Sequence, residues 1–303
     1  MDTIVLTSTS GKDFATRLAD PLDLDVVEVE TRVFSDGESK VRIPVPLDKR
    51  DVILVHSTHP PVDRHMMQLF FILSKVSKVA KSTILIIPYL AYARQDREFL
   101  EGEVISIGTI ADIVCSYMID ALITFDAHSM LALSYFKSQV YNLSAIPLLA
   151  GYFKDMGLDS SGIVVVSPDA GGAARAEEFA SILECRYIVL RKSRDRVTGD
   201  VSIDASSIDI DALKNKVAII VDDMISTGSS VIKAIESIKG LCKEVYVTCT
   251  HALLLGDAYD RIIGAGATDI IASNTVPSHV SRVDVSYIAS MKLRDILKSR
   301  IVR

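Results

Sequence analysis

The sequence predicts an α/β protein with two domains of similar plan, each a mostly parallel sheet flanked by helices. Two observations lead to this fold class. Short apolar runs alternate with helical stretches along the chain, which is the pattern of a parallel sheet with crossover helices. The alternation begins again near residue 145, and 303 residues suffice for two domains of about 150 residues. We expect one domain at 1–145, joined by a closing helix at 290–303, and a second at 146–289.

The composition is that of a well-cored protein. Hydrophobic residues make up 49% and charged residues 24%, and no apolar run approaches the roughly 20 residues of a membrane span. The net charge of −6 argues against nucleic acid as the main partner. No signal-peptide pattern opens the chain, and the four cysteines form no CxxC pair. We therefore expect a cytoplasmic protein with no membrane partner.

The first half of the chain reads as an ordered series of strands and helices. The segment 32–43 holds the turn signal Asp36-Gly37 between two β-like runs, for which a plain hairpin is the simplest interpretation. A helical link joins the first two predicted strands, and a helical stripe follows Pro60-Pro61. Strands are expected at 4–9, 25–30, 51–58, 83–90 and from 121, and helices from 62 and near 106–118.

Two strands of this half end in polar residues that could bind a ligand. The loop 91–103 is dense in charge and contains Arg94, Gln95, Asp96 and Arg97. A solvated loop is one interpretation, but two arginines at the exit of a buried strand are also well placed to grip phosphates. Asp126 and His128 end the next strand. A lone histidine is more often structural, whereas the strand-end position favours a ligand role.

The second half repeats the alternation. Its strand at 162–167 is followed by Asp169, two glycines and a helix, an arrangement that can cradle a diphosphate and offer a carboxylate to a cation. The next strand, from 186, leads into a basic run of Arg191, Lys192, Arg194 and Arg196. This run is either a solvated face or, because it flanks the predicted phosphate turns, part of the catalytic machinery. Further helices are expected at 147–156, 231–241 and 285–301, and further strands at 217–221, 244–254 and 268–275.

The stretch 217–230 carries the strongest functional signal. A short apolar run, Val217–Val221, stops at Asp222 and Asp223, and a glycine-hydroxyl turn leads into a helix. An ordinary βα turn is the alternative to a phosphate site at the helix start. Consecutive strand residues point to opposite faces, so at least one carboxylate faces a covered side of the sheet. These acids therefore need a polyhydroxy ligand, a metal or a basic partner.

The motifs, taken together, resemble those of the ribose-phosphate diphosphokinase (PRPP synthase) family, within the phosphoribosyltransferase-like superfamily. The 217–230 stretch is similar to the PRPP-binding motif, which alone leaves a phosphoribosyltransferase or a PRPP synthase. The likeness extends from Phe34 to the chain end, and five motifs occur in the family's order. They are Phe34-Ser35-Asp36-Gly37-Glu38, Pro88–Asp96, Asp126-Ala127-His128, Ser167–Gly172, and Lys192 with Arg194. Both domains are thus expected to be phosphoribosyltransferase-like.

The resemblance implies a role for each of these residues. ATP would be bound by Phe34, Asp36, Glu38, Arg94, Gln95, Asp96 and Arg97. Ribose 5-phosphate would be bound by Asp222, Asp223, Ser226, Thr227, Gly228, Ser229 and Ser230. His128 and Asp169 would hold Mg²⁺, Gly171 and Gly172 would form the diphosphate turn, and Lys192 and Arg194 would be catalytic. Ser226 and the pair Ser229-Ser230 depart from many bacterial members, but their hydroxyls keep the phosphate-binding chemistry. The segment 198–215 does not match the usual bacterial sequence.

The resemblance also implies the reaction and the assembly. ATP would donate its β,γ-diphosphoryl group to the anomeric hydroxyl of ribose 5-phosphate, giving PRPP and AMP. The loop at Phe34 would complete the adenine pocket of a neighbouring subunit, so a homo-oligomer with shared active sites is expected, with a dimer as the smallest unit. Two alternatives stay open at this point: a nucleobase phosphoribosyltransferase, and a non-catalytic regulatory homologue of the synthase.

Overall fold

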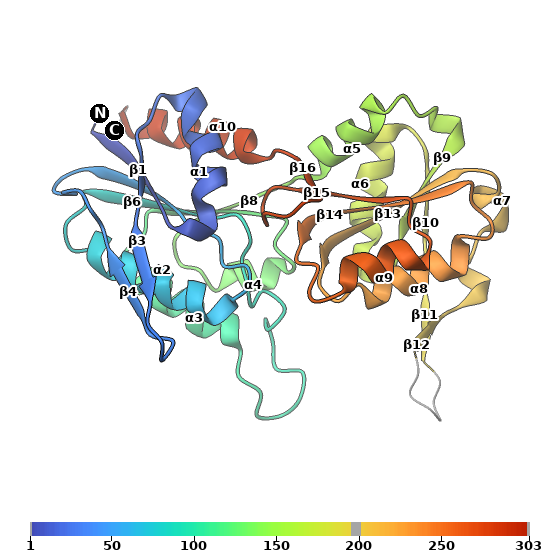
Figure 1. Cartoon of the computed structure of the whole chain (residues 1–303), viewed down its shortest axis with the longest axis horizontal. Coiled ribbons are helices and arrows are strands. Elements are labelled where there is room, and N and C mark those ends of the chain that lie inside the picture. The colour runs from blue at the N-terminus through green and yellow to red at the C-terminus, as the bar shows by residue number, and fades with distance from the viewer. Residues whose placement is uncertain (1, 195–200, 302–303) are drawn as a thin grey trace. The chain divides into compact units, whose positions relative to one another are not determined.

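The computed structural model describes residues 2–194 and 201–301, and it confirms the predicted fold class (Figure 1). The chain divides into two compact units. One comprises Met1–Leu143 together with Val285–Arg303, and the other is Ser144–Asp284. Each unit is built on a six-stranded sheet in which all paired neighbours run parallel. Among the described residues, no helix combines the length and apolar character needed to cross a membrane.

The sheet of the first unit has the strand order β2-β1-β5-β6-β7-β8. Its inner strands form because short runs rich in β-branched and other apolar residues can be buried on both faces of a parallel sheet. Every residue of β1 and of β7 is buried, for example. The strands are β1 (Thr3–Thr7), β2 (Val26–Glu28), β5 (Asp51–Val55), β6 (Ser82–Ile87), β7 (Ala121–Phe125) and β8 (Gln139–Leu143).

Helices cover both faces of this sheet (Figure 1). On one face α1 packs against the C-terminal helix α10, and on the other α2 packs against α3. Arg294 on α10 donates a hydrogen bond to the Pro21 carbonyl at 2.8 Å, which ties the chain end to the first unit. The helices are α1 (Lys12–Ala19), α2 (Val62–Val76), α3 (Ser106–Ser116), α4 (Met130–Ser134) and α10 (Ser286–Ile301).

The second unit repeats the plan with the strand order β10-β9-β13-β14-β15-β16. Helices α5 and α6 pack together on one face of the sheet, and α8 and α9 pack together on the other (Figure 1). The strands are β9 (Ile163–Ser167), β10 (Arg186–Val189), β13 (Val217–Ile225), β14 (Glu244–Ala252), β15 (Asp269–Ser273) and β16 (Ser281–Val283). The helices are α5 (Ile146–Asp155), α6 (Ala173–Leu183), α7 (Ile210–Leu213), α8 (Ser229–Ile238) and α9 (Ala258–Ala265).

Two antiparallel hairpins stand apart from the sheets. The first, β3 (Glu30–Val33) with β4 (Ser39–Arg42), is the hairpin indicated by the Asp36-Gly37 turn signal. The second pairs β11 (Lys192–Arg194) with β12 (Val201–Ile203). It begins directly after β10 and carries the predicted catalytic positions on its first strand.

The structure moves several predicted strand ends, that of β13 most of all, and adds elements that the sequence pattern did not indicate. Strand β13 does not stop at the two acids: it continues through Ile225, because Met224 and Ile225 still pair with His251 and Ala252 of the longer strand β14. The unpredicted helices and strands are β8, β11, β12, β16, α4, α7 and α9. They are short or weakly apolar, so their own sequences carry little periodic signal.

Candidate active site

The sheet of the second unit changes its winding direction between β9 and β13. After β9 the chain crosses to β10 on one side, and it later returns to β13 on the other side of β9. In open α/β sheets, ligands bind at the carboxyl ends of the strands that flank such a point. Both turns singled out in the sequence, the one after β9 and the one after β13, lie at this edge.

The turn after β9 is shaped by Asp169 and a buried glycine. Asp169 caps the short 3₁₀ helix Ala170–Gly172, and its Oδ1 accepts a hydrogen bond from the Gly171 amide at 3.0 Å. Ser167 Oγ donates to the Asp169 carbonyl at 2.7 Å. A Cβ on Gly172 would lie 2.6 Å from Ser167 Oγ, so a larger residue would displace this hydroxyl from its hydrogen bond to Asp169. The turn thus places a carboxylate beside exposed backbone at a strand end.

The turn after β13 also depends on a glycine. Gly228 adopts φ +77°, and a Cβ there would lie 2.8 Å from Ile262 Cδ1. It directly precedes α8, whose first-turn amides and dipole favour an anion at this end. The Thr227 and Ser229 hydroxyls approach each other at 3.2 Å and are both exposed, whereas Ser226 and Ser230 are half-buried. The predicted 5-phosphate residues are therefore collected in one short turn.

The acid pair on β13 has a basic partner that the sequence reasoning missed. Arg175, in the first turn of α6, lies 3.5 Å from Asp222 and 3.8 Å from Asp223, measured from guanidinium nitrogen to carboxylate oxygen. The side chains of Arg175 and Asp222 are about one-fifth exposed and that of Asp223 is 4% exposed. The expected need for a partner is thus met within the protein. The one sequence feature that could have pointed to this partner was a lone arginine three residues after Gly172, on the helix that follows the predicted diphosphate turn.

Burial and mutual repulsion make the acid pair electrostatically unusual. Burial, followed by the negative charge of Asp223, raises the pKa of Asp222 to about 7, while Arg175 opposes this effect. The pKa of the neighbouring Cys249 thiol is also raised, first by the burial of the thiol itself and then by the charges of Asp222 and Asp223. Near neutral pH the pair can therefore both accept and donate hydrogen bonds, a combination that suits a ligand with adjacent hydroxyls.

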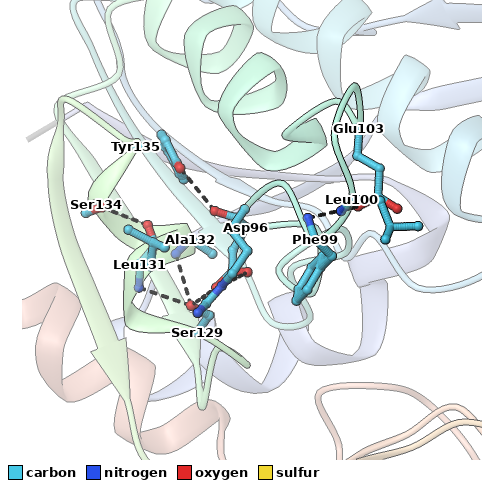
Figure 2. A network of polar contacts seen from close by, with 10 residues as sticks. Asp96, Phe99, Leu100, Glu103, Ser129, Leu131, Ala132, Ser134 and Tyr135 are labelled. Carbon is cyan, nitrogen blue, oxygen red and sulfur yellow. Dashed lines mark hydrogen bonds and ion pairs between the residues drawn. The ribbon is translucent and has the colours of Figure 1, made fainter.

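The loop 91–103, called the nucleotide loop here for its predicted ATP residues, lies in the first unit, after β6. Arg94, Gln95 and Arg97 are exposed, but Asp96 is buried. The Asp96 carboxylate accepts hydrogen bonds from its neighbour Arg97. It also accepts one from Ser129 (Figure 2). These bonds, with Arg97 first, hold the pKa of Asp96 below its ordinary value. The loop therefore presents three of its four predicted ATP residues to solvent and turns the fourth inward.

The β3–β4 hairpin presents Phe34, Asp36 and Glu38, all exposed. The Arg32 guanidinium lies 5.1 Å from the centre of the Phe34 ring, and Asp36 Oδ1 accepts a hydrogen bond from the Glu38 amide at 3.0 Å. A cavity of about 620 Å³ lies between this hairpin and α2. Its lining comprises Gly37, Glu38, Ser39, Asp63, Arg64, Met67 and Phe71.

The corresponding switch point of the first unit, between β1 and β5, is filled by the protein itself. His56 is fully buried, and its two ring nitrogens contact Ser8 Oγ at 2.8 Å and the His65 carbonyl at 2.7 Å. Ser10 Oγ donates to the Ser57 carbonyl at 2.8 Å. Burial lowers the pKa of His56 to about 3, so the ring stays neutral. These contacts give His56 a structural role.

The two predicted magnesium ligands lie in different units. His128 follows β7 in the first unit and is exposed, and Asp169 follows β9 in the second. Within residues 2–194 and 201–301, no three His, Cys, Asp or Glu side chains could hold a metal ion together. Mg²⁺ binds through one or two carboxylates plus substrate phosphates rather than in an all-protein cage, so the Asp169 donor fits it. The imidazole of His128 is a softer donor than Mg²⁺ prefers.

The structure therefore brings the predicted residues together in groups. The second unit gathers the acid pair, the diphosphate turn and the hydroxyl turn, with Arg175 added. The first unit gathers the nucleotide loop and the segment of His128 through the Ser129 bond. The backbones of Lys192 and Arg194 lie on β11, but their side chains and Arg196 are outside the described part of the chain.

A parallel α/β sheet with an acid pair near the carboxyl end of β13, beside two glycine turns at the switch point, is typical of phosphate-binding α/β enzymes. Three family models match in order: the N-terminal domain of ribose phosphate pyrophosphokinase at residues 3–117, the phosphoribosyl transferase domain at 140–254, and the phosphoribosyl synthetase-associated domain at 207–303. The chain belongs to the ribose-phosphate pyrophosphokinase family, and the resemblance seen in its motifs is confirmed.

Named relatives support this assignment over nearly the full length. The chain is 36% identical to a ribose-phosphate pyrophosphokinase of Sulfolobus acidocaldarius over 97% of this chain and all of that protein. It is 34% identical to one of Methanobrevibacter smithii over 96% of this chain and all of that protein. A crystal structure of phosphoribosylpyrophosphate synthetase from Mycobacterium smegmatis matches with a TM-score of 0.87 and 26% identity, covering 99% of this chain and 100% of that one. These matches favour an enzyme of this family over the two alternatives.

Proposed function

We propose that this chain transfers the β,γ-diphosphoryl group of ATP to the anomeric hydroxyl of ribose 5-phosphate. The anomeric oxygen forms a bond to the β-phosphorus while the bond from that phosphorus to the α,β-bridging oxygen breaks, so AMP leaves with the bridging oxygen. The observation that carries the proposal is the acid pair Asp222 and Asp223 with Arg175, beside two anion-binding turns at the switch point of a parallel sheet.

The second unit would bind the acceptor substrate. Asp222 and Asp223 would orient the ribose through its hydroxyls, and the turn 226–230 would hold the 5-phosphate at the start of α8. Gly171 and Gly172 would keep the backbone close to the diphosphate. Because the nucleophile is a hydroxyl of the substrate, the protein's task is positioning and charge stabilisation.

The first unit would bind the donor. Arg94, Gln95 and Arg97 are exposed on one loop and would contact the nucleotide, while Phe34, Asp36 and Glu38 would contact adenine. Mg²⁺ would be held by Asp169 and the triphosphate, with His128 as an additional, softer ligand, and it would neutralise phosphate charge. Lys192 and Arg194 would approach the transferring group from the β11–β12 hairpin, offset its charge and exclude water, whose attack on ATP is the competing reaction.

A coupled assay for AMP tests the reaction. AMP should form from ATP only when ribose 5-phosphate and Mg²⁺ are both present, and it should form in equal amount with PRPP. Replacing ATP and ribose 5-phosphate with PRPP and adenine tests for a nucleobase phosphoribosyltransferase, which would release diphosphate. A chain that binds ATP but forms no AMP would support the regulatory alternative and contradict the proposal.

We further propose that the chain forms a homo-oligomer, at least dimeric, in which the β3–β4 hairpin completes the nucleotide site of a neighbouring subunit across an isologous interface. We propose the cytoplasm as its location. The exposure of Phe34, Asp36 and Glu38 supports this arrangement. Phe34→Ala and Lys192→Ala, each inactive, would be mixed in the unfolded state and refolded. Random pairing makes about half of the dimers mixed with one of two sites intact, so about a quarter of wild-type activity should return. If each site is built within one chain, activity stays at the level of the separate variants.

A further inference from the structure

The carboxylate of Asp96 is engaged in a closed set of polar contacts inside the first unit. Its side chain is 5% exposed, although both flanking residues of the loop are exposed. Arg97 binds it in a two-pronged manner, with Nε 3.1 Å from Oδ1 and Nη2 3.1 Å from Oδ2. Ser129 Oγ also donates to Oδ2 (Figure 2). A carboxylate bonded in this way points into the protein and is not available for direct contact with a nucleotide.

Ser129 connects this carboxylate to the segment that carries His128. Its hydroxyl donates its one proton to Asp96 and accepts hydrogen bonds from the amides of Leu131 and Ala132 at 3.1 and 3.3 Å, which caps α4 (Figure 2). At the other end of α4, Tyr135 Oη donates to the Asp96 backbone carbonyl at 3.0 Å. Residue 96 is thus bound at two points, by its side chain and by its backbone, to the segment 129–135.

We propose that Asp96 is a positioning residue that locks the nucleotide loop to the His128 segment through Ser129 and Tyr135. This role rests on the proposed function and differs from the direct ATP contact expected from the sequence. A guanidinium has five N–H groups, and Asp96 takes two of those on Arg97, whose side chain remains 58% exposed. The remaining three are presented in a fixed orientation, ready to bind phosphate oxygens.

The lock predicts that Asp96 and Ser129 act as one unit in nucleotide binding. Asp96→Asn places an amide N–H₂ group opposite the N–H groups of Arg97 and the hydroxyl of Ser129. Ser129→Ala removes the hydroxyl that joins Asp96 to α4. Each variant should weaken nucleotide binding about tenfold, which is the effect of losing one charge-assisted hydrogen bond. The double variant should bind within about twofold of the weaker single variant, because residues in one network are not additive. Ser129→Thr, which keeps the hydroxyl, should restore binding.

Calorimetry with α,β-methylene-ATP, which cannot undergo the transfer, measures these affinities on the full chain with Mg²⁺ present. Ser134→Ala is the matched control: it lies on the same helix, and its hydroxyl donates to the Leu131 carbonyl at 2.7 Å without contacting Asp96 (Figure 2). It should bind the analogue as the wild type does. Ribose 5-phosphate affinity should stay unchanged in every variant, whereas general loss of structure would weaken both ligands.

Two results would overturn the lock. In the first, Ser129→Ala binds the analogue as tightly as the wild type. In the second, the affinity of the double variant falls about a hundredfold, the product of the two single effects, as expected for independent contacts. Should Asp96→Asn fail to fold, the Ser129→Ala and Ser129→Thr pair decides the matter alone. A wild-type chain that binds neither the analogue nor ribose 5-phosphate would instead refute the proposed function.

Discussion

Replacement of Asp222 by asparagine tests the electrostatics of the acid pair in the absence of substrates. The wild-type carboxyl has its pKa raised from its ordinary 3.8 to about 7, so the folded state resists ionisation that the unfolded chain accepts. The contribution to stability is therefore full below about pH 4 and is lost as the pH rises through about 7. At about 1.4 kcal/mol for each pKa unit, the whole loss is on the order of 4 kcal/mol, of which about 3 kcal/mol falls between pH 5 and 8.

Asparagine has nearly the same shape and does not ionise. The Asp222→Asn variant should therefore be more stable than the wild type at pH 8, and the difference in unfolding free energy between the two should grow by about 3 kcal/mol from pH 5 to pH 8. Urea denaturation followed by circular dichroism, in buffer without phosphate or divalent cations, gives this difference. The same variant should bind ribose 5-phosphate more weakly, as expected for a site that gives up stability for function.

A matched control is Asp257→Asn, because the Asp257 side chain is 73% exposed and lies beside Arg261 on the surface. The difference in unfolding free energy between Asp257→Asn and the wild type should change by no more than about 0.5 kcal/mol over the same pH range. A pH-independent difference for Asp222→Asn would show that the burial of the acid pair has no energetic consequence, and it would refute the electrostatic argument given above.

Three further predictions concern the other parts of the site. Lys192→Ala should lower kcat by about 100- to 1,000-fold with little change in KM, and steady-state kinetics showing only a raised KM would contradict a transition-state role. His128→Ala should shift the Mg²⁺ activation curve to higher concentration, whereas a curve that overlays the wild type would exclude ligation. Gly228→Ala should lose about 1–3 kcal/mol of stability by urea denaturation, because of φ +77° and the approach to Ile262 Cδ1. Adding Ile262→Val should recover part of this loss, and no recovery would place the strain elsewhere.

The acids and the glycine turns at the carboxyl ends of β9 and β13 could be found from the sequence because each is a local pattern. Asp169 with Gly171 and Gly172, and Asp222 and Asp223 with Gly228, occupy single short segments whose hydropathy changes abruptly. Helices α2 and α8 were predictable for the same reason, since an apolar stripe recurs within one segment. The edge strands β8 and β16 were missed because they mix polar and apolar residues and are only partly buried, so no apolar run marks them.

Partners that come from distant segments could not be predicted. Arg175 reaches acids 47 and 48 positions away in the sequence, and Asp96 is bound by Ser129, 33 positions away. The extension of β13 beyond Asp223 likewise depends on β14, which supplies hydrogen-bonding partners as far as Ala252. In each case the deciding group lies on a neighbouring strand or helix that the local pattern does not reveal.

The sequence by itself determined the fold class, the family and the polar residues near the carboxyl ends of the strands, because these depend on spacing and residue type within short windows. Only the tertiary structure decided the charge state and the direction of those residues. Burial beside Asp223 and Arg175 sets the pKa of Asp222, and the contacts with Arg97 and Ser129 turn Asp96 inward. Desolvation and pairing act between segments that are remote in the chain, so they exist only once the sheet has brought those segments together.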